Sequence, residues 1–144
     1  VPPALIPEIV KEARRLGAKL VIVHGETIVE PVKTGTNRAA IEAGADILAH
    51  PGLITRDDML FAKERGITFE ITARKGHSLS NGYVLKSATE IGIPIVINTD
   101  AHEPSDLINK ELAARILLSA GMAENKINAA FEQARALVNR AFKY

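Results

Sequence analysis

The sequence predicts an α/β protein built on parallel strands, and three observations support this class. First, an amphipathic helix, a glycine and an apolar strand follow one another four times along the 144 residues. Second, the expected strands are continuous runs rich in Ile, Val and Leu, as is typical of parallel strands buried on both faces. Third, aromatic residues make up only 4% of the chain and Trp is absent, so small aliphatic residues must build the core.

The four repeats fix the expected elements. Glycine just past a helix favours the left-handed position that ends it, and such glycines precede each expected strand: Gly17, Gly44, Gly66 and Gly92. The strands are then expected over residues 18–24, 45–50, 67–72 and 93–100. Apolar residues mark one face of the first helix: Ile6, Ile9, Val10, Ala13 and Leu16. Two consecutive helices are expected after the last strand, over residues 105–120 and 124–141.

Helix starts have their own signals. Thr55 with Asp58 three residues later resembles a capping box. Ser80 or Asn81 is expected to cap the helix that follows the third strand, and Ser105 the helix that follows the fourth.

Three of the four expected strands end on side chains that bind metals. His24 ends the first and His50 the second, and the fourth leads into Asp100 and His102. The carboxyl ends of parallel strands meet at one rim, where imidazoles and carboxylates can bind divalent zinc or manganese. Asp100 and His102 are two residues apart and would point to one side of an extended backbone. The plainer alternatives are hydrogen-bonded histidines and an aspartate that caps a helix.

The third strand ends differently. It leads into a loop that contains Arg74, Lys75 and His77 around Gly76, which is a candidate for binding phosphate. A solvated basic loop is an equally good interpretation. The sequence does not decide whether Glu70 faces the rim.

Four βα units do not close a barrel, which needs about eight parallel strands. An open sheet is possible, but ligand-type residues at three strand ends favour the C-terminal part of a TIM-like barrel. The rest of the barrel would lie upstream of Val1 or in a second copy. The first and last strands of the segment would then have unpaired edges, so we expect association with that segment or a homo-oligomer.

Composition narrows the function further. Residues 1–144 suit a single domain, and the net charge of +1 gives no electrostatic signature of nucleic-acid binding. The absence of cysteine excludes thiolate metal sites. No segment is long and apolar enough to cross a membrane, and a cytoplasmic location is expected.

The motifs Val23-His24-Gly25-Glu26, Ala49-His50-Pro51-Gly52 and Asn98 to His102 resemble the PHP (polymerase and histidinol phosphatase) family, as does the tract Glu70 to Ser78. This resemblance implies a distorted seven-stranded (β/α)7 barrel that holds two or three zinc, manganese or iron ions. It further implies metal ligands at His24, His50, Asp100 and His102, of which Asp100 and His102 are also catalytic. Arg74, Lys75 and His77 would contact substrate.

The resemblance implies a phosphatase that hydrolyses a small phosphate ester with a metal-activated water. The family's opening His-x-His pair is absent, so this chain would be the C-terminal two thirds of such an enzyme, and its activity would depend on whether the missing ligands are supplied from elsewhere. One alternative is an amidohydrolase that cleaves C–N bonds. Another is a metal-free, PHP-like RNA-binding subunit of ribonuclease P. The intact ligand residues and near-neutral charge favour the phosphoesterase, with a small phosphorylated substrate and no nucleic-acid partner.

Overall fold

The computed structural model describes residues 1–142, which form six α-helices, four strands and four short 3₁₀ turns. The strands are β1 (Ile22–His24), β2 (Ile47–Ala49), β3 (Thr68–Thr72) and β4 (Ile95–Asn98). The helices are α1 (Ile6–Arg15), α2 (Thr36–Glu42), α3 (Arg56–Glu64), α4 (Asn81–Ile91), α5 (Lys110–Ser119) and α6 (Ile127–Ala141). The turns are η1 (Pro3–Leu5), η2 (His77–Ser80), η3 (Pro104–Asp106) and η4 (Glu124–Lys126).

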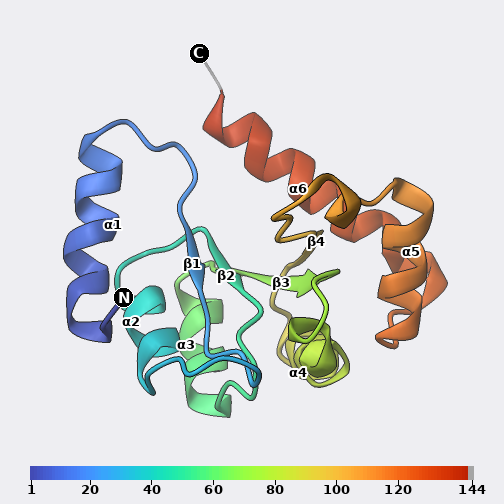
Figure 1. Cartoon of the computed structure of the whole chain (residues 1–144), viewed down its shortest axis with the longest axis horizontal. Helices are drawn as coiled ribbons and strands as arrows, with labels where there is room; N and C mark the ends of the chain where they lie inside the picture. The colour runs from blue at the N-terminus through green and yellow to red at the C-terminus, as the bar shows by residue number, and fades with distance from the viewer. Residues whose placement is uncertain (143–144) are drawn as a thin grey trace.

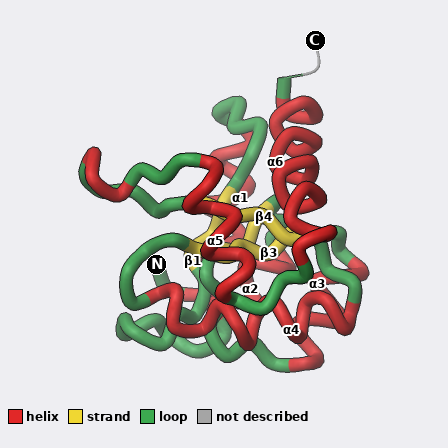
Figure 2. Tube along the Cα trace, turned by 90° about the vertical axis from the view of Figure 1, so that its right-hand side faces the viewer, coloured by secondary structure: helices red, strands yellow, loops and turns green. Residues whose placement is uncertain are grey.

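The strands form one parallel sheet in the order β1-β2-β3-β4, which confirms the predicted α/β class. Each strand pairs with the next along the chain, with Ile22 beside Ile47 and Glu70 beside Val96. In Figure 1, α2, α3 and α4 lie on one side of the sheet and α6 lies on the other. Figure 2 shows the same strands from the side, enclosed by the helices. Within residues 1–142 the sheet is open, with β1 and β4 at its edges.

The predicted glycines end helices as expected. Gly17, Gly44, Gly66 and Gly92 all have positive φ, between 69° and 97°. A residue with a Cβ pays a steric cost in this region, whereas glycine does not. Each glycine therefore ends a helix and lets the chain turn into the strand that follows.

The two faces of the sheet differ in polarity. The face toward α6 carries polar side chains near the carboxyl ends of the strands, where the candidate site described below lies. Leu48, Phe69 and Ile71 are fully buried in the main core, which α3 and α4 cover. On the opposite face, Ile47 and Val96 pack against Leu137 of α6. This apolar packing lies near the start of the strands. Toward the carboxyl ends, the same face carries polar side chains.

Several boundaries differ from the prediction. Helix α5 begins at Lys110, where Asn109 caps it by accepting a hydrogen bond from Leu112 N–H at 2.8 Å. Ser105 instead donates to the Glu103 carboxylate. Strand β1 begins later than predicted, at Ile22, and the N–H of the preceding residue, Val21, donates to the Asp46 carboxylate at 2.8 Å.

Other helix features were predicted with mixed success. Thr55 caps α3 by accepting from Asp58 N–H at 3.2 Å, which confirms the capping signal. Ser80 occupies the N-cap position of α4, as one of the two predicted alternatives, but makes no side-chain capping bond. Asn81 is the first residue of α4, and its side chain accepts from the Thr72 N–H and donates to the Thr72 carbonyl. No helix in the described part of the chain is long and apolar enough to cross a membrane.

Candidate functional site

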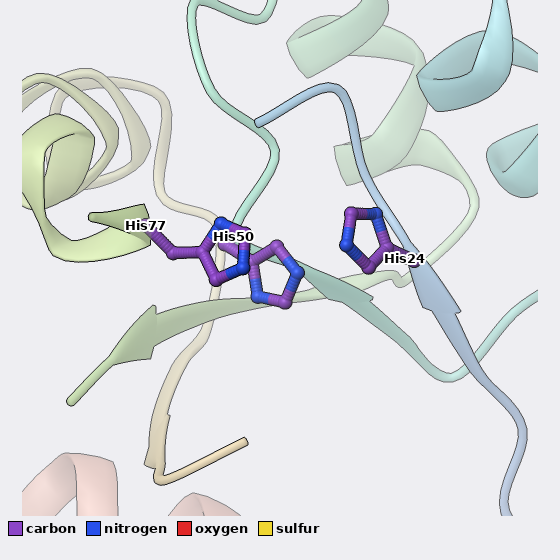
Figure 3. A group of neighbouring side chains, drawn as sticks. All are labelled: His24, His50 and His77. Atoms are coloured by element: carbon purple, nitrogen blue, oxygen red, sulfur yellow. The ribbon is translucent and has the colours of Figure 1, made fainter. Parts of the chain in front are cut away.

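Three histidines meet at the rim, defined here as the carboxyl ends of β1–β4 and the loops that follow them. One ring nitrogen from each of His24, His50 and His77 lies within 4.8 Å of the other two. The His50 and His77 rings stack with centroids 4.3 Å apart, and His24 stands edge-on to His50 at 4.4 Å (Figure 3). The expected meeting of His24 and His50 is therefore seen. His77, predicted to contact substrate, belongs to the same group.

His50 is the most constrained member. It follows β2 with φ of 31°, which is unusual for a residue other than glycine. Glu70, buried on β3, accepts hydrogen bonds from both the His50 backbone N–H at 3.1 Å and its Nδ1 at 2.9 Å. The imidazole is 3% exposed, and its Nε2 has no hydrogen-bond partner among the described residues. Glu70 thus faces the rim and fixes the direction of that nitrogen.

His77 begins the turn η2, just after Gly76, whose φ is 84°. The ring is buried, and its Nδ1 lies 2.6 Å from the Thr27 hydroxyl. Burial lowers the pKa of His77 below its ordinary value, and the neighbouring charge of His50 lowers it further. A neutral imidazole is the form that can offer a lone pair to a cation.

His24 is more exposed, and its Nδ1 lies 2.9 Å from the Gly25 carbonyl oxygen. Its Nε2 faces the Glu30 carboxylate at 3.3 Å, and His77 Nε2 lies 3.4 Å from the other oxygen of the same group. Glu30 therefore joins two of the three histidines. Sequence reasoning missed this residue because it lies in a loop, away from any strand end.

The loop that carries Glu30 is fastened at its base by Glu26 and Asn37. Glu26 accepts hydrogen bonds from the N–H groups of Gly35 and Asn37, both at 2.9 Å. The Asn37 side chain in turn accepts from Glu26 N–H and donates to the Pro51 carbonyl. The backbone N–H groups of Gly35 and Asn37 at the start of α2 are thus already paired with Glu26.

Asp100 and His102 do not join the group in the way the sequence suggested. Asp100 has φ of 47°, so the backbone between the two residues is not extended. Its carboxylate comes within 3.8 Å of His77 Nε2. His102 is exposed, and its ring contacts the Asp100 backbone carbonyl at 2.8 Å. The metal-binding and catalytic roles assigned to these two residues stay predictions.

The basic loop does not form an open phosphate cradle. Arg74 makes an ion pair with Asp106 at 2.7 Å. Asp106 also accepts from the backbone N–H groups of His102 and Glu103, and these bonds, with the Arg74 charge, lower its pKa. Lys75 is exposed and makes no ion pair within residues 1–142. Of the three predicted substrate contacts, Lys75 alone presents its charge to solvent.

Comparison with known proteins corrects the family expectation. No protein-family model matches this chain. Uncharacterized protein MJ1295 of Methanocaldococcus jannaschii is 48% identical over 128 residues, which cover 88% of this chain and 59% of that protein. Two probable phosphatases, from Thermoanaerobacter sp. and Thermoanaerobacter pseudethanolicus, are each 30% identical over 93 residues. Those alignments cover 57% of this chain and 38% of each phosphatase. The chain thus spans well under two thirds of these relatives.

The fold is similar to that of a chain in the cryo-EM structure of archaeal ribonuclease P with mature tRNA. The two share a TM-score of 0.76 with 21% sequence identity, and the match covers 94% of this chain and 63% of that one. At this identity the likeness concerns the fold. The likeness covers nearly all of this chain, so its helices and strands have the same arrangement as in that ribonuclease P chain.

These findings overturn the membership in the PHP family and the phosphatase, hydrolase and phosphoesterase assignment that depended on it. The three motifs lie at strand ends as expected, but the phosphatase-named relatives match only part of the chain, whereas the ribonuclease P likeness spans nearly all of it. At the rim itself, the His102 ring contacts the Asp100 backbone carbonyl, and Arg74 is paired with Asp106. The expectation of a small phosphorylated substrate, with no nucleic acid, is corrected with it.

Proposed function

We propose that this chain is part of a non-catalytic, RNA-associated subunit, the scaffold alternative raised by the sequence. The observation that carries this proposal is the likeness to a chain of archaeal ribonuclease P over 94% of the described fold. That assembly contains tRNA, so a subunit built on this fold would meet structured RNA and other macromolecules in it.

The arrangement of the rim supports a scaffold. Its polar groups are largely engaged with one another: Glu70 with His50, Thr27 with His77, and Asp106 with Arg74. A scaffold that presents a surface to RNA needs that surface to be rigid. Mutual satisfaction of buried polar groups produces such rigidity.

In this proposal, the Lys75 side chain contacts a phosphate group of the RNA. It is exposed in the loop between β3 and η2, beside a paired arginine, and can approach a phosphate without breaking an ion pair. With a net charge of +1, the chain would make few phosphate contacts. The salt dependence of RNA binding is then expected to be shallow, since it scales with the number of phosphates neutralised.

Two further expectations belong to this proposal. The four-stranded sheet would be part of a larger βα barrel, which the exposed edge residue Ile22 (55% exposed) and the partial coverage of longer relatives support. A cytoplasmic location fits an RNA-associated role.

Fluorescence anisotropy with labelled mature tRNA and an archaeal ribonuclease P RNA tests the proposal. We expect micromolar or tighter binding that weakens as salt rises from about 50 to 200 mM. Lys75→Ala should weaken binding several-fold and reduce the salt slope by about 1. Lys86→Ala, which removes an exposed lysine from α4, is the matched control and should leave both unchanged. Equal affinity for duplex DNA of the same length, or a Kd weaker than about 100 μM, would refute the proposal.

A further inference from the structure

We propose that His24, His50, His77 and Glu30 bind a single divalent transition-metal ion of the zinc type, and that this ion has a structural role. It would join four separate segments: the end of β1, the loop before α2, the end of β2 and the turn η2. The inference is independent of RNA binding and assigns ligand roles to His77 and Glu30.

One ring nitrogen of His50 is buried and unpaired among the described residues. A carboxylate can only accept hydrogen bonds, so Glu70 requires the proton to lie on His50 Nδ1, and Nε2 then carries a lone pair. That atom is buried without a partner in the described chain. A buried polar atom left unpaired destabilises a fold, and native proteins rarely tolerate one. A metal ion at Nε2 supplies the missing partner.

In all three rings, Nδ1 lies within hydrogen-bond distance of an oxygen atom. The partners are Glu70 for His50, the Gly25 carbonyl for His24 and the Thr27 hydroxyl for His77. Outer oxygen partners of this kind orient metal-binding histidines and fix their tautomer. The Nε2 atoms are thereby left for the common centre.

The Glu30 carboxylate lies at ligand spacing from two of the histidines. In a tetrahedral zinc site with bonds of about 2.0–2.1 Å, neighbouring ligand atoms lie about 3.3 Å apart. Glu30 oxygens lie 3.3 Å from His24 Nε2 and 3.4 Å from His77 Nε2. Nitrogen–nitrogen separations within 4.8 Å must shorten further, and the half-exposed His24 side chain can move inward.

The donor set also selects the ion and its role. Three imidazoles and one carboxylate suit zinc and related ions, whereas magnesium and calcium prefer oxygen ligands. Four protein ligands complete a tetrahedral shell and leave no position for a reactive water, which is the pattern of structural zinc sites. The Asp100 carboxylate, 3.8 Å from His77 Nε2, adds negative charge beside the ion.

Isothermal titration of the chelator-stripped chain with zinc chloride tests this inference. We expect one ion per chain, a rise in Tm of about 5–10 °C at saturating zinc, and no effect of magnesium. Zinc X-ray absorption on the loaded chain should report four N/O ligands at about 2.0 Å, with the multiple scattering that imidazoles produce. Neither readout depends on RNA or on any activity.

Variants locate the site. Glu30→Gln should weaken zinc binding by about 10–100-fold while the zinc-free Tm stays close to that of the parent, because Glu30 is half-exposed. His77→Gln should abolish stoichiometric binding, with circular dichroism confirming the fold. Glu90→Gln, an exposed glutamate on α4, is the control and should bind as the parent does. Absence of stoichiometric zinc, or equal binding by the parent, Glu30→Gln and His77→Gln, would overturn the inference.

Discussion

The Glu70 carboxylate on β3 accepts two hydrogen bonds from His50 on the neighbouring strand, one from its backbone N–H and one from its ring. Both side chains are nearly inaccessible to solvent. This paired contact holds His50 at a positive φ and directs its free nitrogen toward His24 and His77. The orientation of the histidine group therefore depends on a residue that is not part of it.

Glu70→Gln tests that dependence. Both bonds end on the same carboxylate oxygen, Oε2, and the neutral amide oxygen of glutamine accepts them more weakly than a carboxylate oxygen does. We expect a loss of about 1–3 kcal/mol in the free energy of unfolding, measured by urea denaturation. The same change at exposed Glu90 should alter stability by less than about 0.5 kcal/mol. A Glu70→Gln protein as stable as the parent would show that the contact does not hold His50.

Gly52 is required because two loops touch at the rim. Its φ is 63°, and a Cβ there would overlap the Glu26 carbonyl oxygen. Gly52→Ala must therefore displace the loop before α2, at a cost of about 3 kcal/mol or more. Gly44→Ala is the matched comparison, since φ is 75° but nothing lies within 4 Å. That change should cost about 1 kcal/mol. Equal losses of Tm in the two variants would contradict the close approach.

Asp46 connects three elements around the start of β2. Its carboxylate binds Arg14 of α1 and Arg140 of α6, and it accepts from Val21 N–H at 2.8 Å. We expect Asp46→Ala to lower the free energy of unfolding by about 1–2 kcal/mol, mainly through the unpaired Val21 N–H. Arg140 is 62% exposed, so Arg140→Ala should cost less than about 1 kcal/mol. Chemical denaturation of both variants measures the difference, and a larger effect for Arg140→Ala would refute this ranking.

Asp106 should make the free energy of unfolding depend measurably on pH in the acid range. Hydrogen bonds from the backbone N–H groups of His102 and Glu103, with the charge of Arg74, lower its folded pKa below the ordinary 3.8. The unfolded chain then binds more protons in this window, so stability rises with pH there. The contribution is complete above about pH 5 and is lost as the pH falls through the folded pKa. Carboxyl NMR should show Asp106 titrating below 3.8.

Asp106→Asn should reduce the dependence of the free energy of unfolding on pH in this acid range. Asp57→Asn serves as the control, because Asp57 is an exposed aspartate that makes no ion pair in the described chain. A titration of Asp106 at or above its ordinary pKa would contradict the assignment.

Sequence reasoning succeeded where the signal was local. Glycines such as Gly44 and Gly66 marked helix ends because a positive φ is a property of a single residue. Hydrophobic runs predicted the strands because burial on both faces demands continuous apolar residues. The same reasoning failed at Asn81, whose side chain bonds to β3 rather than to its own helix.

The sequence by itself determined the parallel α/β class, the order of its elements and the presence of His24 and His50 at neighbouring strand ends. Only the tertiary structure shows that His77 lies with His24 and His50 and that Glu30 contacts His77, while the His102 ring contacts the Asp100 backbone carbonyl. The physical reason is that strand ends are set by periodicity along the chain. The direction of a side chain in a loop depends on φ values and on hydrogen bonds to residues far away in sequence, such as the bond between Thr27 and His77.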